Sequence, residues 1–460
     1  MGKRIRTTMS VLALGLGLAL TGQALAWSDA ELATAKALKA KALAGSPAFD
    51  VTASLTTEIG PRMAGSEADK RAVDWAVKKL KAMGYDRVWT EPVRFPLWTR
   101  GTESAQILSP YPQKLAITTL GHSVATPAGG ITAEVALFDS LEALQADTSG
   151  RAKGKIVFIN KRMERFKDGA GYGKAVNARS QGATVGAEHG ALAVVIRSIG
   201  TDSDRLPHTG VMRYDEHATT KIPAAAISNP DADLLAREVG YGKPVTLKLD
   251  LSVENGPEVE SANVIGEMRG SEKPEEIVLL GAHLDSWDLG TGAIDDGAGV
   301  GIVSSAGKLI GELKQRPKRT VRVVLFANEE NGLYGGKAYA ALHKDELGKH
   351  IIGAESDFGA GRVYEFHTNV PAERLPAMDK LAEQLADLGI TRGGNESSGG
   401  PDMKPSHEFG MPVAELQQDG TDYFDYHHTA NDTLDKVEPK NLDQNVAAYA
   451  VFAYLMAQMP

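Results

Sequence analysis

The sequence predicts an α/β fold, with a mixed, mostly parallel sheet that has helices on both faces and a smaller β-rich domain inserted into it. Beyond Glu258, strand patterns alternate with helix patterns, which is typical of a sheet covered by helices on both sides. Residues 320–327 are almost continuously apolar, as expected of a strand buried on both faces. Between about residues 120 and 251, short strand patterns are instead separated by glycine-rich loops.

The chain before the insertion is predicted to contain two helices, at residues 31–43 and 67–83. In the second helix the apolar residues recur at helical spacing, and Ser66 stands where it can cap the first turn. The turn at residues 60–66 contains glycine and proline, which explain it structurally. It also contains Arg62, to which the sequence assigns no definite role.

The inserted domain is predicted from five short strands and a scarcity of long helices. The strands are expected at residues 134–138, 155–160, 192–197, 224–228 and 245–251. We therefore divide the chain into a leader at 1–26, a first segment of the main domain at 27–119, the insertion at 120–252 and a second main segment at 253–460.

The second main segment repeats the order of strand and helix. Its strands are expected at residues 263–268, 277–282, 320–327, 362–367 and 412–416. Its helices are expected at residues 297–314, 334–344, 371–388 and 440–459. In open sheets of this kind, ligands bind beyond the carboxyl ends of the strands, so polar residues that follow a strand are candidates for the site.

The N-terminus has the pattern of a cleaved secretory signal. Basic residues near the start precede an apolar run at residues 11–20 and a small-x-small sequence at 24–26. The apolar run is much shorter than the roughly 20 residues needed to span a bilayer. We expect the mature chain to begin at Trp27, to carry no membrane anchor and to be periplasmic or secreted.

The composition excludes several classes of site and partner. Because the chain has no Cys, disulfides, thiolate zinc sites, cysteine nucleophiles and lipid attachment at a cysteine are all ruled out. The formal net charge of -9 argues against a nucleic-acid partner, which would require clustered basic residues.

The first candidate site residues follow the strand expected at 277–282. His283 has a carboxylate two residues on, at Asp285, which suits a metal ligand whose other ring nitrogen is held by a partner. Asp295 arrives just before a predicted helix and could bridge two metals with its two oxygens. The alternative is that Asp295 and Asp296 only cap that helix, as acidic residues commonly do.

Two carboxylates, Glu329 and Glu330, follow the strand expected at 320–327. Neighbouring side chains at a strand end point in opposite directions, so one can bind metal while the other faces a metal-bound water. The alternative is an ordinary solvated acidic loop. Farther along, Asp357 follows a short apolar segment, and two adjacent histidines lie near the end of the chain.

Taken together, these residues favour a metal centre over the separate alternatives. All of them fall at or near predicted strand ends of one domain and supply the nitrogen and oxygen ligands that zinc accepts. Two divalent metals carry four positive charges, which Asp295, Glu330 and Asp357 reduce to one, and a bridging hydroxide would neutralise that one. Glu329 then stays free for proton transfer. The proposed ligands are His283, Asp295, Glu330, Asp357 and His428.

The order of these motifs resembles one family of enzymes. The chain reads His-x-Asp, Ile-Asp-Asp-Gly-Ala-Gly, Asn-Glu-Glu-Asn-Gly-Leu, Glu-Ser-Asp and His-His-Thr-x-x-Asp-Thr. This order is similar to that of the co-catalytic zinc peptidases, which include bacterial leucyl aminopeptidases and glutamate carboxypeptidases. The likeness covers essentially the whole mature chain. It implies a zinc-exopeptidase main domain, with the insertion as a protease-associated domain.

The resemblance also implies the cofactor and the role of each residue. Two zinc ions are expected per chain, one held by His283, Asp295 and Asp357 and the other by Asp295, Glu330 and His428. Glu329 corresponds to the catalytic acid/base, while Asp285 and Asp432 are expected beside the ligands. The chain departs from many relatives in having His427 before His428. The Thr-x-x-Asp-Thr that follows puts His428 in the ligand register and leaves His427 to line the site.

By the same resemblance, the substrate should be a dipeptide or short peptide with a free terminus, and the protein should form a homodimer. Three alternatives remain open: an aminopeptidase acting on longer peptides, a one-zinc glutaminyl cyclase, and a non-catalytic receptor on the same fold. Such receptors arise when the metal ligands are lost, whereas this chain retains all of them. Tyr423 and Tyr426 either shape the substrate pocket or pack ordinarily. The glycines at residues 169–173 are interpreted as loop, not as a dinucleotide-binding motif.

Overall fold

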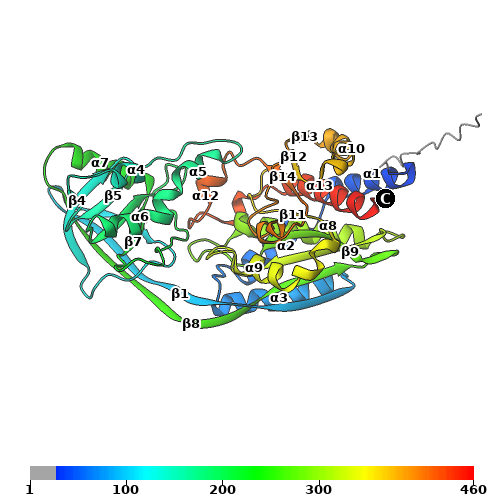
Figure 1. Ribbon diagram of the computed structural model, residues 1–460, viewed down its shortest axis with the longest axis horizontal. Helices are drawn as coiled ribbons and strands as arrows, with labels where there is room; N and C mark the ends of the chain where they lie inside the picture. Colours follow the sequence, from blue (N-terminus) through cyan, green and yellow to red (C-terminus); the bar gives the residue numbers. More distant parts are fainter. Residues whose placement is uncertain (1–26, 460) are drawn as a thin grey trace, which may run out of the picture.

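The structure is a computed structural model that describes residues 27–459. The predicted signal sequence at 1–26 lies outside the described residues. The chain forms two lobes, which a long antiparallel ribbon joins along one edge (Figure 1). The ribbon consists of β1 (Arg87–Ser109) and β8 (Thr246–Met268), each of which runs from one lobe into the other.

The larger lobe is built on the mixed, mostly parallel sheet that the sequence predicts. Its central strands are parallel neighbours in the order β14-β11-β9-β10, with β8 antiparallel to β10 and β12 antiparallel to β14. The strands are β9 (Lys273–His283), β10 (Arg319–Phe326), β11 (His350–Glu355), β12 (Val363–Asn369), β13 (Thr391–Arg392) and β14 (Val413–Gln418). The carboxyl ends of β9, β10 and β11 therefore lie side by side at one edge.

Helices cover both faces of this sheet, as expected (Figure 1). One face carries α8 (Ala298–Gly311) and α13 (Pro439–Gln458), and α1 (Asp29–Ala44) and α2 (Ala48–Glu58) pack against these two. On the same face, α3 (Glu67–Ala82) contacts the ribbon and shares the core of α8 and α13, whereas α9 (Tyr334–Leu342) packs on the other face. The helix expected at 371–388 is mainly α10 (Leu375–Leu385), which packs against α13.

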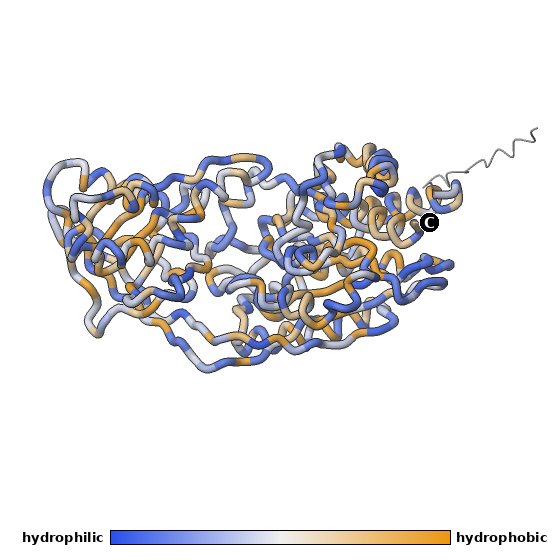
Figure 2. The backbone as a smooth tube through the Cα atoms, in the orientation of Figure 1, coloured by the Kyte–Doolittle hydropathy of each residue, from blue (hydrophilic) through white to orange (hydrophobic). Residues whose placement is uncertain are grey.

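Apolar residues fill the interior on both sides of the sheet (Figure 2). Alternate residues of β9 join different cores, because successive side chains of a strand point to opposite faces. Val278 and Leu280 pack with the α8 and α13 side, whereas Ile277 and Leu279 pack with Tyr339 of α9. Among residues 27–459, no helix combines the length and apolar composition needed to cross a bilayer.

The smaller lobe contains more helix than the sequence predicts. Its strands β4 to β7 are parallel neighbours, and β3 is antiparallel to β7. These strands are β3 (Ile117–Thr119), β4 (Ile131–Phe138), β5 (Ile156–Ile159), β6 (Ala193–Arg197) and β7 (Ala224–Ile227). Four helices accompany them: α4 (Leu141–Gln145), α5 (Ala170–Ala175), α6 (Asn177–Glu188) and α7 (Asn229–Gly240). The identification of this lobe as a protease-associated domain stays a prediction.

The longest helices described in this lobe are α6 and α7, of 12 residues each, so the expectation of few long helices is confirmed, although the sequence assigned no range to either. In α6, small residues serve helix packing. A Cβ added at Gly186 would lie 2.5 Å from Val194 of β6, so this glycine allows the helix to approach the sheet closely. The interpretation of the glycines at 169–173 as loop was wrong. Gly169 directly precedes α5, and Gly171 and Gly173 lie inside it.

The sequence also gave no indication of β1. Pro92, Pro96 and Gly101 break the strand pattern, but proline is tolerated at the edge of a sheet, where β1 lies in the larger lobe. The strands expected at 245–251 and 263–268 are two parts of the single strand β8, so the predicted boundary after residue 252 falls inside a continuous strand.

We expect Leu280→Ala to destabilise the protein strongly. Leu280 is fully buried in the middle of β9, and truncation of such a side chain costs about 2–5 kcal/mol through lost burial and the cavity left behind. Thermal unfolding monitored by circular dichroism should show a clearly lower midpoint. Leu342→Ala, at a position that is 63% exposed, is the control and should change the free energy of unfolding by no more than about 0.5 kcal/mol.

Candidate metal centre

The carboxyl-terminal edge of the parallel strands brings the predicted ligands together. His283 is the last residue of β9, Glu330 follows β10, and Asp357 follows β11. Because these three strands are parallel neighbours, the side chains meet at one edge of the sheet. His283 and Glu330 are buried, and the Asp357 side chain is only 8% exposed.

The sequence left open whether Asp295 and Asp296 bind metal or cap the following helix, and the structure gives each residue a different position. The Asp296 carboxylate accepts hydrogen bonds from the backbone N–H groups of His283 and Gly299, each at 3.0 Å. Asp296 therefore caps α8 and ties it to the end of β9. Asp295 turns its carboxylate toward the histidines instead, from a turn of non-helical backbone that precedes α8.

The two oxygens of Asp295 face two different groups of side chains. Asp295 Oδ1 lies 3.1 Å from His283 Nε2, which is itself 3.4 Å from Asp357 Oδ1. Asp295 Oδ2 lies 3.3 Å from His428 Nε2, which is 3.0 Å from Glu330 Oε2. The structure thus gathers all five predicted ligands into two sets that share Asp295.

These distances fit zinc. Ligand atoms bound to a tetrahedral zinc at about 2.0 Å lie about 3.3 Å from one another. The observed separations are close to that value, and the donors are the imidazole nitrogens and carboxylate oxygens that zinc accepts. Asp295 Oδ2 and Glu330 Oε1 are also buried with no hydrogen-bond partner among residues 27–459. An unsatisfied buried acceptor is costly, and a cation would satisfy both.

The electrostatics of the cluster also call for cations. Burial would raise the pKa of Asp295, but the hydrogen bond with His283 and the nearness of the His428 ring lower it well below its usual value. Burial, together with the Asp295 charge, raises the pKa of Glu330 well above normal. Burial and the charge of Asp357 likewise raise the pKa of Glu329, although His283 opposes this. Bound cations would stabilise the ionised forms of such crowded carboxylates.

Asp285 contacts both His283 and Glu329. The closer contact of His283 Nδ1 is with the main-chain oxygen of Asp285, at 3.0 Å, and the carboxylate oxygen is 3.7 Å away. The main chain, rather than the expected carboxylate, therefore orients the ring. The Asp285 carboxylate accepts a hydrogen bond of 3.0 Å from the backbone N–H of Glu329 and so fixes the start of the glutamate pair.

Arg62 and Asp432 brace the loop between His283 and Asp295. The fully buried Arg62 donates hydrogen bonds to three main-chain carbonyls of that loop, those of Leu284, Thr291 and Gly292. Asp432 Oδ1 accepts hydrogen bonds of 2.7 Å from two consecutive backbone N–H groups, those of Ala293 and Ile294. Arg62, to which the sequence assigned no role, therefore helps to position His283 and Asp295, two of the proposed ligands.

The smaller lobe positions His428. His428 Nδ1 lies 3.2 Å from the carbonyl oxygen of Thr209, a residue of the smaller lobe. The Thr209 N–H in turn donates to the His428 carbonyl at 3.0 Å. Beside this pair, the His427 carbonyl lies 2.7 Å from Nδ1 of His208, whose Nε2 is 2.7 Å from Asp202. No local sequence signal could reveal these contacts, because the partners are 219 residues apart.

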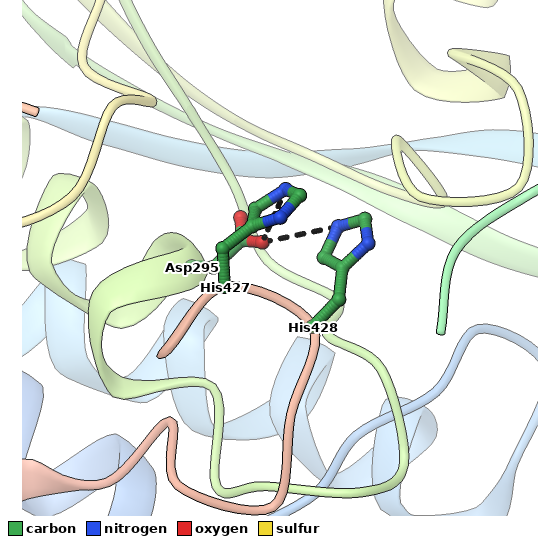
Figure 3. A group of neighbouring side chains, drawn as sticks. All are labelled: Asp295, His427 and His428. Carbon is green, nitrogen blue, oxygen red and sulfur yellow. Dashed lines mark ion pairs between the residues drawn. The ribbon is translucent and has the colours of Figure 1, made fainter. Parts of the chain in front are cut away.

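His427 lies beside His428 without replacing it. The two rings stack with centroids 3.5 Å apart, and His427 Nε2 is 3.6 Å from Asp295 Oδ2 (Figure 3). His427 Nδ1 has no hydrogen-bond partner within the described chain. His428 makes the shorter contact with Asp295 and also reaches Glu330, so the geometry favours His428 as the ligand.

A cavity of about 340 Å³ opens onto this cluster between the two lobes. The larger lobe contributes Asp295, Glu329, Glu330, Asp357, Phe358, Tyr423, Phe424, His427 and His428 to its lining. The smaller lobe contributes Tyr172, Arg179, Val211 and Arg213, and Tyr172 stacks on Phe424 with ring centroids 5.1 Å apart. Tyr423 therefore does line the cavity, whereas Tyr426 does not belong to its lining.

Several known proteins are similar to this chain in sequence and in fold. The profile of peptidase family M28 matches residues 263–453. Carboxypeptidase Q from Mus musculus is 37% identical over 405 residues, which cover 88% of this chain and 84% of that protein. The crystal structure of a peptidase M28 precursor from Shewanella amazonensis SB2B is 54% identical, with a TM-score of 0.92, and the match covers 93% of this chain and 97% of that one. A zinc aminopeptidase from Bacillus subtilis, 22% identical with a TM-score of 0.62, has a similar fold over 88% of this chain and 93% of its own.

We expect His428→Ala and Glu330→Ala each to lower the zinc content by about one ion per chain, since each removes a direct ligand. Elemental analysis of the purified protein after dialysis measures this. His217→Ala, at an exposed position, is the control and should leave the zinc content unchanged. Full zinc content in both ligand variants would place the metal elsewhere.

Proposed function

We propose that this chain, which belongs to peptidase family M28 and is a metallopeptidase, uses two zinc ions to hydrolyse dipeptides or short peptides. The observation that carries this proposal is the shared position of Asp295, whose two oxygens each face a separate set of ligands. The 37% identity to carboxypeptidase Q supports a dipeptidase or carboxypeptidase activity. The alternative is an aminopeptidase that releases N-terminal residues from longer peptides.

Zinc bound at this site would supply Lewis acidity, which polarises a carbonyl and lowers the pKa of a water. Glu329 is the residue of this chain that moves the proton. It lines the cavity beside the proposed ligands and is held through its backbone by Asp285, whose carboxylate accepts from the Glu329 N–H at 3.0 Å. Glu329 therefore accepts the proton of the attacking water and returns it to the leaving amine.

Two further proposals rest on sequence and resemblance. Because the leader has the pattern of a secretory signal, we place the mature protein in the periplasm or outside the cell. The resemblance to co-catalytic zinc peptidases suggests a homodimer. Size-exclusion chromatography with light scattering would measure the oligomeric state of the mature chain.

Glu329→Gln should retain its zinc and lose roughly 10²-fold or more in turnover, because the amide cannot accept a proton. Steady-state hydrolysis of a dipeptide, measured alongside zinc content, makes this test. Glu383→Gln, an exposed site on α10, should behave like the unchanged protein. If Glu329→Gln turned over normally with full zinc, another group would have to be the base.

Activity should depend on two metal ions. A chelator should remove activity, and stepwise return of zinc should restore it fully only near two equivalents per chain, because the two ligand sets share Asp295. Titration with simultaneous activity measurement shows the stoichiometry. Full recovery at one equivalent would contradict the two-zinc proposal and favour a peptidase that works with one zinc.

A further inference from the structure

A second pocket, of about 230 Å³, adjoins the cavity on the side of Asp357. The cavity and this pocket share Asp357, Phe358 and Pro401 in their linings, so the pocket lies beside a proposed zinc ligand. Glu355 and Glu415 line it as well, and within the described chain its lining contains no lysine, arginine or histidine. We therefore call it the acidic pocket.

The pairing of two strands brings the two glutamates together. Glu355 is the last residue of β11, Glu415 lies in β14, and the two are direct partners in the parallel pairing. Partner side chains lie on the same face of a sheet, where like charges are unfavourable. Other glutamates of the sheet, Glu267 and Glu276, form ion pairs with arginines, whereas neither glutamate of the acidic pocket has such a partner among residues 27–459.

The histidine on the next strand does not compensate this charge. His367 of β12 is the partner of Glu415 on its other side, but its Nε2 lies 3.1 Å from Glu365. Its Nδ1 accepts a hydrogen bond of 3.1 Å from the Gly394 N–H, and a ring nitrogen that accepts carries no proton. The ring is therefore neutral. The one hydrogen bond that the Glu415 carboxylate accepts from a side chain comes from the neutral hydroxyl of Ser397, at 2.8 Å.

The Glu355 carboxylate is fixed by one oxygen and free at the other. Oε2 accepts hydrogen bonds from the backbone N–H groups of Asp402 at 2.9 Å and Met403 at 3.4 Å. A Cβ added at Gly400 would lie 2.3 Å from Oε2, so this glycine lets the turn pass over the carboxylate. Oε1 is buried with no hydrogen-bond partner among residues 27–459, and the residue is only 4% exposed. Such an unsatisfied acceptor is costly, and a donor that enters the pocket would satisfy it.

The rest of the lining suits the stem of a basic side chain. Phe358, Pro401 and Leu416 supply apolar surface beside the glutamates, and lysine and arginine pack their stems on such surface. The pocket has the volume of about seven water molecules of about 30 Å³ each, which gives an extended side chain room. A further metal ion fits less well, because neither glutamate belongs to a group of three close metal-ligand atoms in the described chain.

We propose that the acidic pocket binds the cationic side chain of a lysine or arginine on the amino side of the cleaved bond. This inference rests on the proposed peptidase function and names a substrate class for it. The residue on the carboxyl side of a dipeptide carries a free α-carboxylate, which Glu355 and Glu415 would repel. The residue on the amino side carries a free α-amino group instead, which is compatible with an acidic surface.

The test compares lysyl-alanine with norleucyl-alanine, which lacks only the ammonium group of the side chain. The zinc-loaded protein should prefer lysyl-alanine by about 10- to 100-fold in kcat/KM, the size expected of hydrogen bonds to charged groups. Glu355→Gln should bring this ratio close to one, mainly by raising KM for lysyl-alanine, because the amide keeps an oxygen for the backbone contacts but loses the charge. Glu415→Gln should lower the ratio in part. Zinc content, measured in parallel, should stay the same in both variants.

Glu365→Gln is the matched control, since it removes a carboxylate of the neighbouring strand that faces His367 and does not line the acidic pocket. It should keep the full preference for lysyl-alanine. Absence of that preference in the unchanged protein would overturn the proposal, and so would a preference that survives in both variants of the pocket. If Glu355→Gln does not fold or loses zinc, an undiminished preference in Glu415→Gln would overturn it alone.

The experiment separates failure of this inference from failure of the proposed function. Each ratio compares two peptides on one protein, so a general loss of activity cancels. A zinc-loaded protein that cleaves neither peptide contradicts the proposed dipeptidase function itself. A protein that cleaves both equally well is a peptidase without a preference for basic residues, and that result contradicts only the role of the acidic pocket.

Discussion

The geometry of the site depends on one buried carboxylate, that of Asp295, which lies between two histidines from distant parts of the chain. Each of its oxygens is paired with one histidine, and each histidine is next to one further carboxylate. Such a concentration of buried anionic groups is unfavourable without cations. Metal binding and the stability of this edge of the sheet are therefore linked, because the ions bind the folded arrangement and have no preformed site in the unfolded chain.

Rigid elements hold most of this arrangement, and few of the supporting contacts involve exposed loops. The strand ends place His283, Glu330 and Asp357 directly, while Arg62 and Asp432 hold the intervening loop through its backbone. Backbone carbonyls and N–H groups serve as the partners in each case. A substitution that shifts the loop would therefore move His283 and Asp295 together, so the supporting residues are as important for geometry as the ligands are for chemistry.

The sequence could predict the sheet and the clustering of the candidate ligands because both leave local patterns. The apolar run at 320–327 identified a buried strand, and carboxylates after strand ends identified the site, since parallel strands bring their carboxyl ends together. The long strand β1 was missed because its prolines and glycine look like breaks in a strand. The roles of Arg62 and Thr209 could not be predicted, because they contact main-chain atoms more than 200 residues away and leave no spacing to recognise.

The smaller lobe gives the site what the sheet edge alone does not supply. The larger lobe contributes the candidate metal ligands and Glu329, whereas the smaller lobe contributes Arg179 to the cavity lining and places Thr209 3.2 Å from Nδ1 of His428. A ligand that enters this cavity would contact residues of both lobes. In this arrangement, the inserted lobe positions one candidate ligand and forms part of the cavity wall, while the sheet edge supplies the other groups of the cluster.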